Sequence, residues 1–254
     1  MQIFIYFIIF VFGIVFGSFY NVLGYRLPKK ESIVFPSSHC PSCNHKLKFL
    51  DLIPILSYVI LKGRCRYCKK KISIIYPLIE LITGLLFILS YRLYGLSFQF
   101  FISIIFSSVA VITIASDIRY MVINDEVLIV SGVLILILIF ASGGVNAFLE
   151  VIKNALISFI MIFIIKLSAD YLFKKEAMGG GDVKLLTFIG ALVNYQMMIV
   201  TLCLSAFIAF PYAIFIYFKK EEHILPLGPF LCIAGLIIFF LGIDFSDLMQ
   251  IMAN

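Results

Sequence analysis

The sequence contains no tryptophan, only three histidines and few charged residues, although it is 254 residues long. Charged side chains make up 13% of the chain, which is about half of their share in soluble domains. Hydrophobic residues make up 63%, and the mean hydropathy is +1.11. So little polar surface excludes both a water-soluble globular domain and a disordered chain. The composition therefore predicts an all-α polytopic membrane protein.

Apolar runs recur along the whole chain, and a helix that crosses a bilayer needs about 20 such residues. The first run begins without basic residues, so we expect a retained helix rather than a cleaved signal peptide. The apolar segment 50–61 is too short to cross and is predicted to lie in the membrane interface. We predict about eight transmembrane helices, over 3–27, 74–94, 98–116, 127–141, 148–171, 183–193, 196–218 and 225–243.

Positive charges orient membrane helices, and they are unevenly placed here. Ten of the 20 lysines and arginines lie between Lys29 and Lys71. Placing that loop in the cytoplasm leaves Arg92 as the one basic residue of the outer connections, as the positive-inside rule requires. This predicts a multi-pass membrane protein with both chain ends outside. The net charge of +6 is then explained by topology and lipid contact, without nucleic acid as a partner.

Two C-x₂-C motifs, separated by 21 residues, stand in the basic loop: Cys40, Cys43, Cys65 and Cys68. Four thiolates in this spacing suit tetrahedral Zn²⁺. A structural ion is favoured over a catalytic one because four cysteines close the coordination sphere. Two disulfides are the weaker alternative in a reducing compartment. The other two cysteines, Cys203 and Cys232, lie in apolar runs, where we expect small core residues.

Two aspartates lie at the ends of apolar runs, where carboxylates are costly and tend to be functional. Asp117 ends the third run, and Asp182 follows a run of three glycines. The predicted topology puts both at the cytoplasmic face, where they could meet. Two carboxylates that share a site cannot both ionise cheaply, so one keeps a proton while the other activates water. The pair predicts general acid and base catalysis of peptide hydrolysis.

Each aspartate also has a plainer interpretation. Asp182 suits a helix N-cap, although Lys184 in the first turn would oppose the helix dipole. An acid at a helix C-terminus, such as Asp117, is destabilised by that dipole and needs another reason to be there. From this asymmetry we expect a raised pKa for Asp117, the acid, and a lowered pKa for Asp182, the base. Among the other acids, Asp125 is expected to cap a helix, and Asp51 and Asp170 to be interfacial charges.

These features occur in an order that resembles a known family. Gly179-Gly180-Gly181-Asp182 fits the GxGD motif of intramembrane aspartyl proteases, and nearly the whole chain resembles a bacterial type IV prepilin leader peptidase and N-methyltransferase of the peptidase A24 family. The other matching segments are Gly17-Ser18-Phe19-Tyr20-Asn21-Val22, Tyr25-Arg26-Leu27-Pro28, the two cysteine motifs, Tyr76-Pro77-Leu78-Ile79-Glu80, Asp117 and Pro226-Leu227-Gly228-Pro229-Phe230.

The resemblance implies a multi-pass protein of the bacterial inner (plasma) membrane, with Asp117 and Asp182 as the catalytic pair at the cytoplasmic face. The substrates would be type IV prepilins and pseudopilins, cleaved after the glycine that ends a short basic leader. Methylation of the new N-terminus, usually phenylalanine, by S-adenosylmethionine would follow. The implied division is a methyltransferase-associated part, 1–94, and a six-helix peptidase domain, 95–254. The residues that the resemblance links to methyl transfer are Gly17, Asn21, Arg26, Pro28 and Glu80.

Other functions remain open at this stage. A GxGD protease without methyltransferase activity would keep the aspartates but would not need the cysteine loop. A non-enzymatic scaffold could bind partners through its zinc knuckles, and a transporter could use the carboxylates as a proton relay. One departure from the family pattern is visible, since Ile123-Asn124-Asp125 lacks the usual proline. Its absence removes a fixed backbone angle before the next helix.

Overall fold

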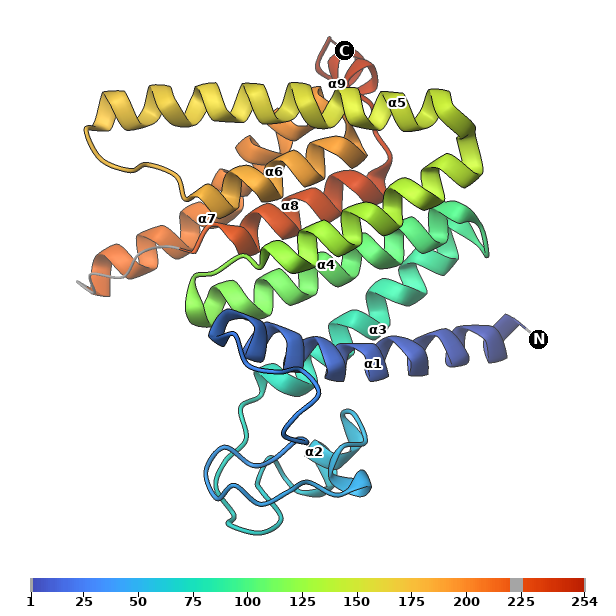
Figure 1. Cartoon of the computed structure of the whole chain (residues 1–254), viewed down its shortest axis with the longest axis vertical. Helices are drawn as coiled ribbons and strands as arrows, with labels where there is room; N and C mark the ends of the chain where they lie inside the picture. The colour runs from blue at the N-terminus through green and yellow to red at the C-terminus, as the bar shows by residue number, and fades with distance from the viewer. Residues whose placement is uncertain (1, 220–225, 254) are drawn as a thin grey trace. The chain divides into compact units, whose positions relative to one another are not determined.

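A computed structural model describes residues 2–219 and 226–253, and all its regular elements in those ranges are helical (Figure 1). Apart from two isolated β-bridges, no strand pairing occurs in the described chain. The elements are α1 (Gln2–Arg26), η1 (Leu27–Lys29), η2 (Phe49–Asp51), α2 (Leu56–Ile60), α3 (Ile75–Tyr94), α4 (Phe98–Tyr120), α5 (Asp125–Phe173), α6 (Gly180–Val193), α7 (Tyr195–Lys219), α8 (Gly228–Leu241) and α9 (Phe245–Ala253).

Helix covers most of each predicted apolar run, although the last run, 225–243, is helical only over 228–241 in the described residues, and the all-α membrane fold is confirmed. Two of the runs lie within α5, which is broken at Gly144 (φ 66°, ψ −159°), and Figure 1 shows the chain reversing there. Glycine adopts this positive φ without the cost that a Cβ would add. The short helix α9 was not predicted, and the basic connection 219–224 lies almost wholly outside the described residues.

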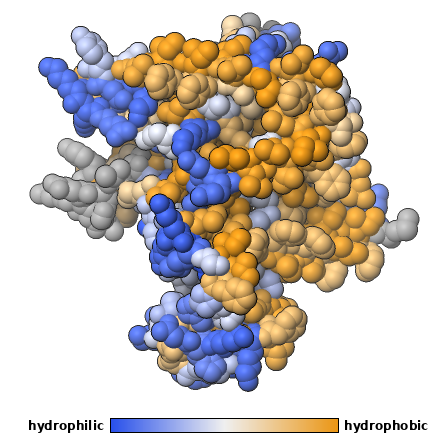
Figure 2. All heavy atoms as spheres, viewed as in Figure 1, coloured by the Kyte–Doolittle hydropathy of each residue, from blue (hydrophilic) through white to orange (hydrophobic). Residues whose placement is uncertain are grey.

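Five of the described helices are long and apolar enough to cross a membrane: α1, α3, α4, α5 and α7. With 14 residues each, α6 and α8 are about 21 Å long, which is less than the ~30 Å hydrocarbon core. The number of crossings and the orientation of the chain therefore stay predictions. Many large apolar side chains on the long helices are exposed, as a lipid-facing surface requires (Figure 2).

The chain divides into two compact units, residues 1–116 and 117–254, and the division falls inside α4. In the first unit, α1 packs closely on α3. A Cβ at Gly13 would lie 2.7 Å from the Cα of Gly84, so only glycine allows this approach of the two backbones. A buried cluster of Ile9, Phe87 and Phe100 joins the same helices to α4.

In the second unit, α6 lies among α5, α7 and α8 and contacts all three (Figure 1). Its Leu185, Leu186 and Ile189 side chains are fully buried, which explains how a short helix is held firmly in the bundle. A Cβ at Gly190 would collide with Ser158 of α5, so this glycine lets the two helices approach. This packing fixes the start of α6, where Asp182 stands.

The two remaining cysteines differ from each other. Cys232 in α8 is buried, as expected of a small core residue. Cys203 in α7 is exposed, so the expectation of a core position is wrong for it. The apolar run that contains it has an outward face, and a small apolar thiol is as compatible with lipid as with a protein core.

Candidate functional site

Asp117 lies in the last turn of α4, and its side chain is almost completely buried, with 5% of the residue exposed. The backbone N–H of Gly228, the first residue of α8, donates to its Oδ2 atom over 3.1 Å. A Cβ at Gly228 would lie 2.6 Å from the same oxygen, so glycine is required there. This contact explains why an acid is tolerated at the C-terminus of α4. The start of α8 supplies a hydrogen-bond donor to the Asp117 carboxylate.

Asp182 is the third residue of α6, and its N–H donates to the carbonyl oxygen of Gly179 over 3.2 Å. The N-cap of α6 is Gly179, with extended backbone angles, so the interpretation of Asp182 as an N-cap is wrong. Burial, followed by the negative charge of Asp117, raises the pKa of Asp182 to about 6. The two carboxylates therefore lie within electrostatic reach of each other, inside the second unit.

The raised pKa contradicts the expectation that the start of α6 would lower it. The helix dipole stabilises a carboxylate at a helix N-terminus by about 2 kcal/mol at most. The effect of burial beside a second acid on the pKa of Asp182 outweighs it here. A pair of this kind titrates as a unit and can hold one proton between its two carboxylates. Such an arrangement provides an acid and a base at one place at neutral or mildly acidic pH.

Lys166 of α5 ties down the segment that precedes the glycine run. Its Nζ atom donates to the carbonyl oxygen of Met178 over 2.6 Å and to Glu176 Oε1 over 2.9 Å. Asp170, one turn later, accepts the N–H of Ala177 over 2.7 Å and lies 3.9 Å from Lys166. Asp170, expected to be an interfacial charge, thus helps to fix the segment that leads to Asp182.

Lys166 also lowers the pKa of Asp182, in opposition to burial and Asp117. Sequence reasoning did not single it out, although the signal was present. A lysine inside a predicted membrane helix is costly unless it serves a purpose.

The segment between α4 and α5 packs against the glycine run. A Cβ at Gly181 would lie 3.2 Å from the Cβ of Ile123. Next to it, Asn124 is the N-cap of α5 with φ −80° and ψ 119°. This φ is close to the −65° that a proline ring imposes, so the backbone at Asn124 already has an angle that proline would accept. The buried Asn124 Nδ2 atom has no hydrogen-bond partner within residues 2–219 and 226–253.

Asp125 does not act as the predicted cap. It is the first residue of α5, and its two oxygens accept from Lys184 Nζ over 2.8 and 2.7 Å. This exposed ion pair explains why a cation stands in the first turn of α6, although such pairs contribute only about 0–1 kcal/mol.

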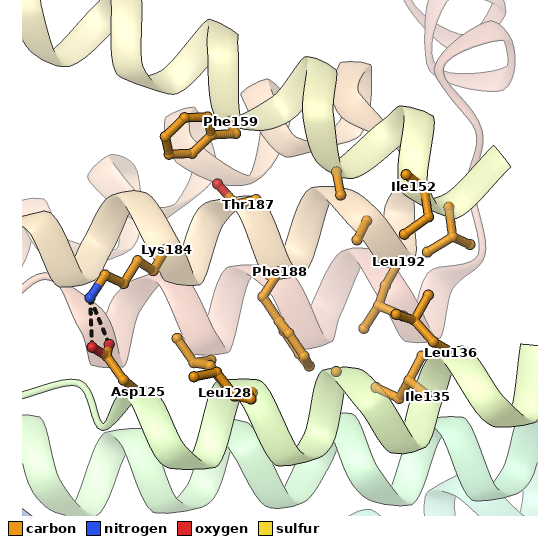
Figure 3. A pocket seen from close by; sticks show the side chains of 15 residues that line it. Asp125, Leu128, Ile135, Leu136, Ile152, Phe159, Lys184, Thr187, Phe188 and Leu192 are labelled. Atoms are coloured by element: carbon orange, nitrogen blue, oxygen red, sulfur yellow. Dashed lines mark hydrogen bonds and ion pairs between the residues drawn. The ribbon is translucent and has the colours of Figure 1, made fainter. Parts of the chain in front are cut away.

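Figure 3 shows Asp125 and Lys184 at one end of a mostly apolar groove of about 380 Å³, which Phe188, Thr187 and other side chains of α5 and α6 line. Lys184 is about 200° around the helix from Asp182, so the groove lies away from the carboxylate pair.

The four cysteines come together in the loop of the first unit. Their sulfur atoms all lie within 4.8 Å of one another, and the Sγ atoms of Cys40 and Cys68 are 3.9 Å apart. Tetrahedral zinc with Zn–S bonds of 2.3 Å would separate its sulfur ligands by about 3.8 Å. Although burial opposes ionisation, the amides of Ser42 and Cys43 and the neighbouring thiols lower the pKa of Cys40 to about 7. The cluster can hold a metal ion.

Two backbone knuckles of the same construction carry these cysteines. The N–H of Asn44 donates to the carbonyl of Cys40 over 2.8 Å, and the N–H of Lys69 donates to that of Cys65 over 3.0 Å. Asn44 and Lys69, each directly after the second cysteine of its motif, have positive φ values of 54° and 59°. The repeat shows that the loop is built around its sulfur atoms.

Asp51, also expected to be an interfacial charge, links η2 to the second knuckle. Its Oδ1 atom accepts from Arg66 Nε over 2.6 Å, and its Oδ2 atom accepts the N–H of Lys48 over 3.2 Å. Burial opposes ionisation, but Arg66 and Lys48 together hold the pKa of Asp51 below its ordinary value.

Three of the residues linked to methyl transfer meet where α1 crosses α3. A Cβ at Gly17 would lie 2.8 Å from the Cα of Glu80. Asn21 Nδ2 donates to the carbonyls of Gly17 and Tyr76, each over 3.2 Å. Glu80 is buried, and its Oε2 atom accepts the N–H of Ile55 over 2.7 Å.

The other two residues of that set lie at the end of α1. Arg26 donates to the carbonyls of Ser32 and Pro36 over 2.9 and 2.8 Å, and Pro28 lies in η1. Arg26 and Pro28 thus shape the start of the cysteine loop, while Gly17, Asn21 and Glu80 form a separate buried group.

We expect Asn124→Pro to leave the fold intact and to raise stability by about 0.4–1 kcal/mol, because the native φ suits proline and the unfolded chain loses freedom. The change also removes a buried amide without a partner. Thermal unfolding in detergent measures the effect, with Asn124→Ala as the control that lacks the ring. A midpoint below that of Asn124→Ala would show that the local backbone rejects proline.

Two family models match separate stretches of the chain. Residues 11–94 match the family described as the bacterial peptidase A24 N-terminal domain, and residues 104–214 match the type IV leader peptidase family. No solved structure matches.

Several curated relatives carry the name prepilin leader peptidase/N-methyltransferase. The one from Bacillus subtilis is 30% identical over 92% of this chain and 94% of its own length. The one from Vibrio cholerae is 33% identical over 93% and 97%. The relative from Myxococcus xanthus is 34% identical over 74% of this chain, a match that spans 56% of that protein. With such similarity over nearly its whole length, the chain belongs to the type IV leader peptidase family.

Proposed function

We propose that this protein cleaves the leader peptide of type IV prepilins and pseudopilins and then methylates the new amino terminus. The observation that carries the peptidase half is the electrostatic contact between Asp117 and Asp182 in the second unit. The names of the relatives support both activities. In this proposal, cleavage takes place at the cytoplasmic face of the bacterial inner membrane, where the positive-inside rule predicts that both carboxylates lie.

Hydrolysis uses the single proton that the pair holds. The ionised carboxylate takes a proton from a water molecule, whose oxygen attacks the carbonyl carbon of the scissile bond. The protonated carboxyl donates its proton to the carbonyl oxygen as charge develops there. Return of a proton to the leaving amine then breaks the C–N bond. Because the pair titrates as a unit, the acid and base roles belong to the pair, not to either residue.

The glycine run suits an extended peptide. Gly179 and Gly180 are exposed, and no described atom lies within 4 Å of the position that a Cβ would take at Gly180. A backbone without side chains lets a substrate strand approach Asp182 closely. The N–H of Gly228 keeps Asp117 in place from the other side.

Zn²⁺ is the ion that we assign to Cys40, Cys43, Cys65 and Cys68. Four thiolates leave no open coordination position, so the ion would hold the loop together and take no part in hydrolysis.

S-adenosylmethionine is the methyl donor in this proposal, and when bound it supplies an electrophilic methyl group on a cationic sulfonium. Glu80 fits such a ligand, because it is a buried side chain that forms no salt bridge with any described residue. A buried anion of this kind favours a cation beside it. Glu80 would therefore bind and orient the sulfonium or the substrate amine, with Gly17 and Asn21 beside it.

Mass spectrometry of a prepilin incubated with the purified protein, lipid and S-adenosylmethionine tests the function. We expect loss of the leader and gain of one methyl group with the wild type. Asp117→Asn and Asp182→Asn should each slow cleavage at least about a hundredfold, because each removes half of the acid–base pair. Asp125→Asn, which breaks only the exposed pair with Lys184, should cleave normally.

Methylation separates the alternatives. A peptide that already begins at the mature residue should be methylated by both aspartate variants, since the peptidase pair is not needed for it. Cleavage without any methylation would leave a GxGD protease alone. Cleavage that survives both substitutions would reject the aspartyl mechanism.

Lys166→Met should move both limbs of the pH–rate profile of cleavage to higher pH. The cation lowers the pKa of Asp182, so its removal favours the protonated form and the pair keeps its proton longer as pH rises. Lys166→Arg should restore the profile, and Lys153→Met, on the exposed side of α5, should leave it unchanged. A lower rate with an unmoved profile would reduce Lys166 to an anchor for Met178.

Metal analysis of the purified protein checks the zinc assignment. We expect one zinc per chain in the wild type and none after Cys40→Ser with Cys65→Ser, which remove a ligand from each knuckle. Cys203→Ser is the matched control and should keep the metal. Limited proteolysis should then cut the loop of the metal-free variant faster, because the knuckles lose their common ligand. Equal metal content in all three proteins would contradict the assignment.

A further inference from the structure

The loop that carries the cysteines has a strongly apolar edge. Phe49 and Leu50 of η2, and Leu56, Val59 and Ile60 of α2, are between 58% and 80% exposed. The two short helices contact each other, so these side chains belong to one patch of the first unit. Contiguous apolar surface of this kind marks an interaction site, since scattered single residues would need no explanation.

A hydrogen bond fixes the depth of this apolar edge relative to the membrane helix α3. The N–H of Ile55, directly before α2, donates to Glu80 Oε2 over 2.7 Å. Glu80 is the sixth residue of α3, and its Cα lies about 8 Å along the helix axis from the first residue. The start of α2 is therefore held beside the first turns of a membrane helix, not out in the surrounding water.

The backbone at this point is strained, which shows that the position is specified. Ile55 has φ 61° and ψ −52°, a conformation that β-branched residues avoid at a cost of about 1–3 kcal/mol. The bond to the Glu80 carboxylate offsets part of that cost.

In Figure 2, hydrophobic residues of the cysteine loop gather on the side toward which α1 runs from Arg26 back to its N-terminus in Figure 1. A bilayer that contains α1 would face this side of the loop.

Basic residues flank the apolar edge in the sequence. Lys48 precedes it and Lys62 follows it, and the loop between Lys29 and Lys71 has ten basic residues but only two acids, which pair with Lys29 and Arg66. A hollow of about 390 Å³ lies at the end of the apolar segment. Its lining is mostly cationic: Lys62, Arg64, Arg66 and Lys69, with Leu61 and Cys65.

We propose that the cysteine loop docks on the bilayer surface, with the apolar edge between the acyl chains and its cations on anionic phospholipid headgroups. Amphipathic segments bind in this way, with the apolar face about 5–10 Å into the headgroup boundary. Each nearby lysine or arginine adds about 1 kcal/mol of attraction to anionic lipid. A second copy of the chain would bring like charges together, and the basic leader of a prepilin would be repelled. The proposal requires membrane insertion of α1 and α3 but neither enzymatic activity.

The absence of tryptophan from the chain makes the test unusually clean, because one introduced tryptophan is the sole indole. Phe49→Trp and Ile60→Trp place the probe on the apolar edge, and Lys70→Trp, exposed in the second knuckle, is the control. Each full-length variant is reconstituted in vesicles of phosphatidylcholine and phosphatidylglycerol with brominated acyl chains. Retained metal content shows that the loop of each variant is folded.

We expect brominated lipid to reduce the emission of Trp at 49 and 60 about twofold or more, as for an indole within the acyl boundary, and to leave the control nearly unchanged. Lys62→Glu with Lys69→Glu should weaken quenching at position 60 in mixed vesicles and not in pure phosphatidylcholine. Emission at 49 and 60 as red-shifted and unquenched as the control would overturn the proposal. A blue shift without quenching would also overturn it, because protein rather than lipid would then cover the edge.

Discussion

Two carboxylates held near each other in an apolar bundle are the constraint on which the second unit is built. One ends a helix and the other begins a helix, and burial with mutual repulsion makes it costly for both to be charged. Contacts around the two carboxylates partly offset that cost. The N–H of Gly228 stabilises Asp117, and Lys166 partly offsets the charge around Asp182. The same balance leaves the pair able to give and take a proton, so its stability and its chemistry have one origin.

The sequence alone predicted the helices well, and it singled out the four cysteines and the two aspartates that the structure brings together. Long apolar runs have few alternatives to helix in lipid, and the spacing of the C-x₂-C motifs leaves few ways to arrange four sulfur atoms. What failed depended on contacts between distant segments. The pKa of Asp182 follows from burial and from Asp117, which no local rule includes. Asp125 pairs with Lys184, 59 residues away, instead of capping its helix.

Within the first unit, one buried carboxylate connects three features. Glu80 lies against Gly17, accepts the amide of Ile55 and so joins the crossing of α1 and α3 to the loop that carries the cysteines. The cysteine cluster, the apolar edge and the group linked to methyl transfer therefore belong to one connected part of the first unit. The carboxylate pair of the second unit has separate contacts, with the N–H of Gly228 at Asp117 and with Lys166 at the segment before Asp182.

Infrared titration of the protein with isotope-labelled aspartate tests the central claim directly, because a protonated carboxyl absorbs apart from a carboxylate. In the wild type, a buried carboxyl band should disappear as pH rises through about 6. In Asp117→Asn, the remaining band of Asp182 should titrate at lower pH, since the neighbouring negative charge is gone while burial persists. A midpoint for Asp182 that is the same in both proteins would mean that the two carboxylates do not share a site.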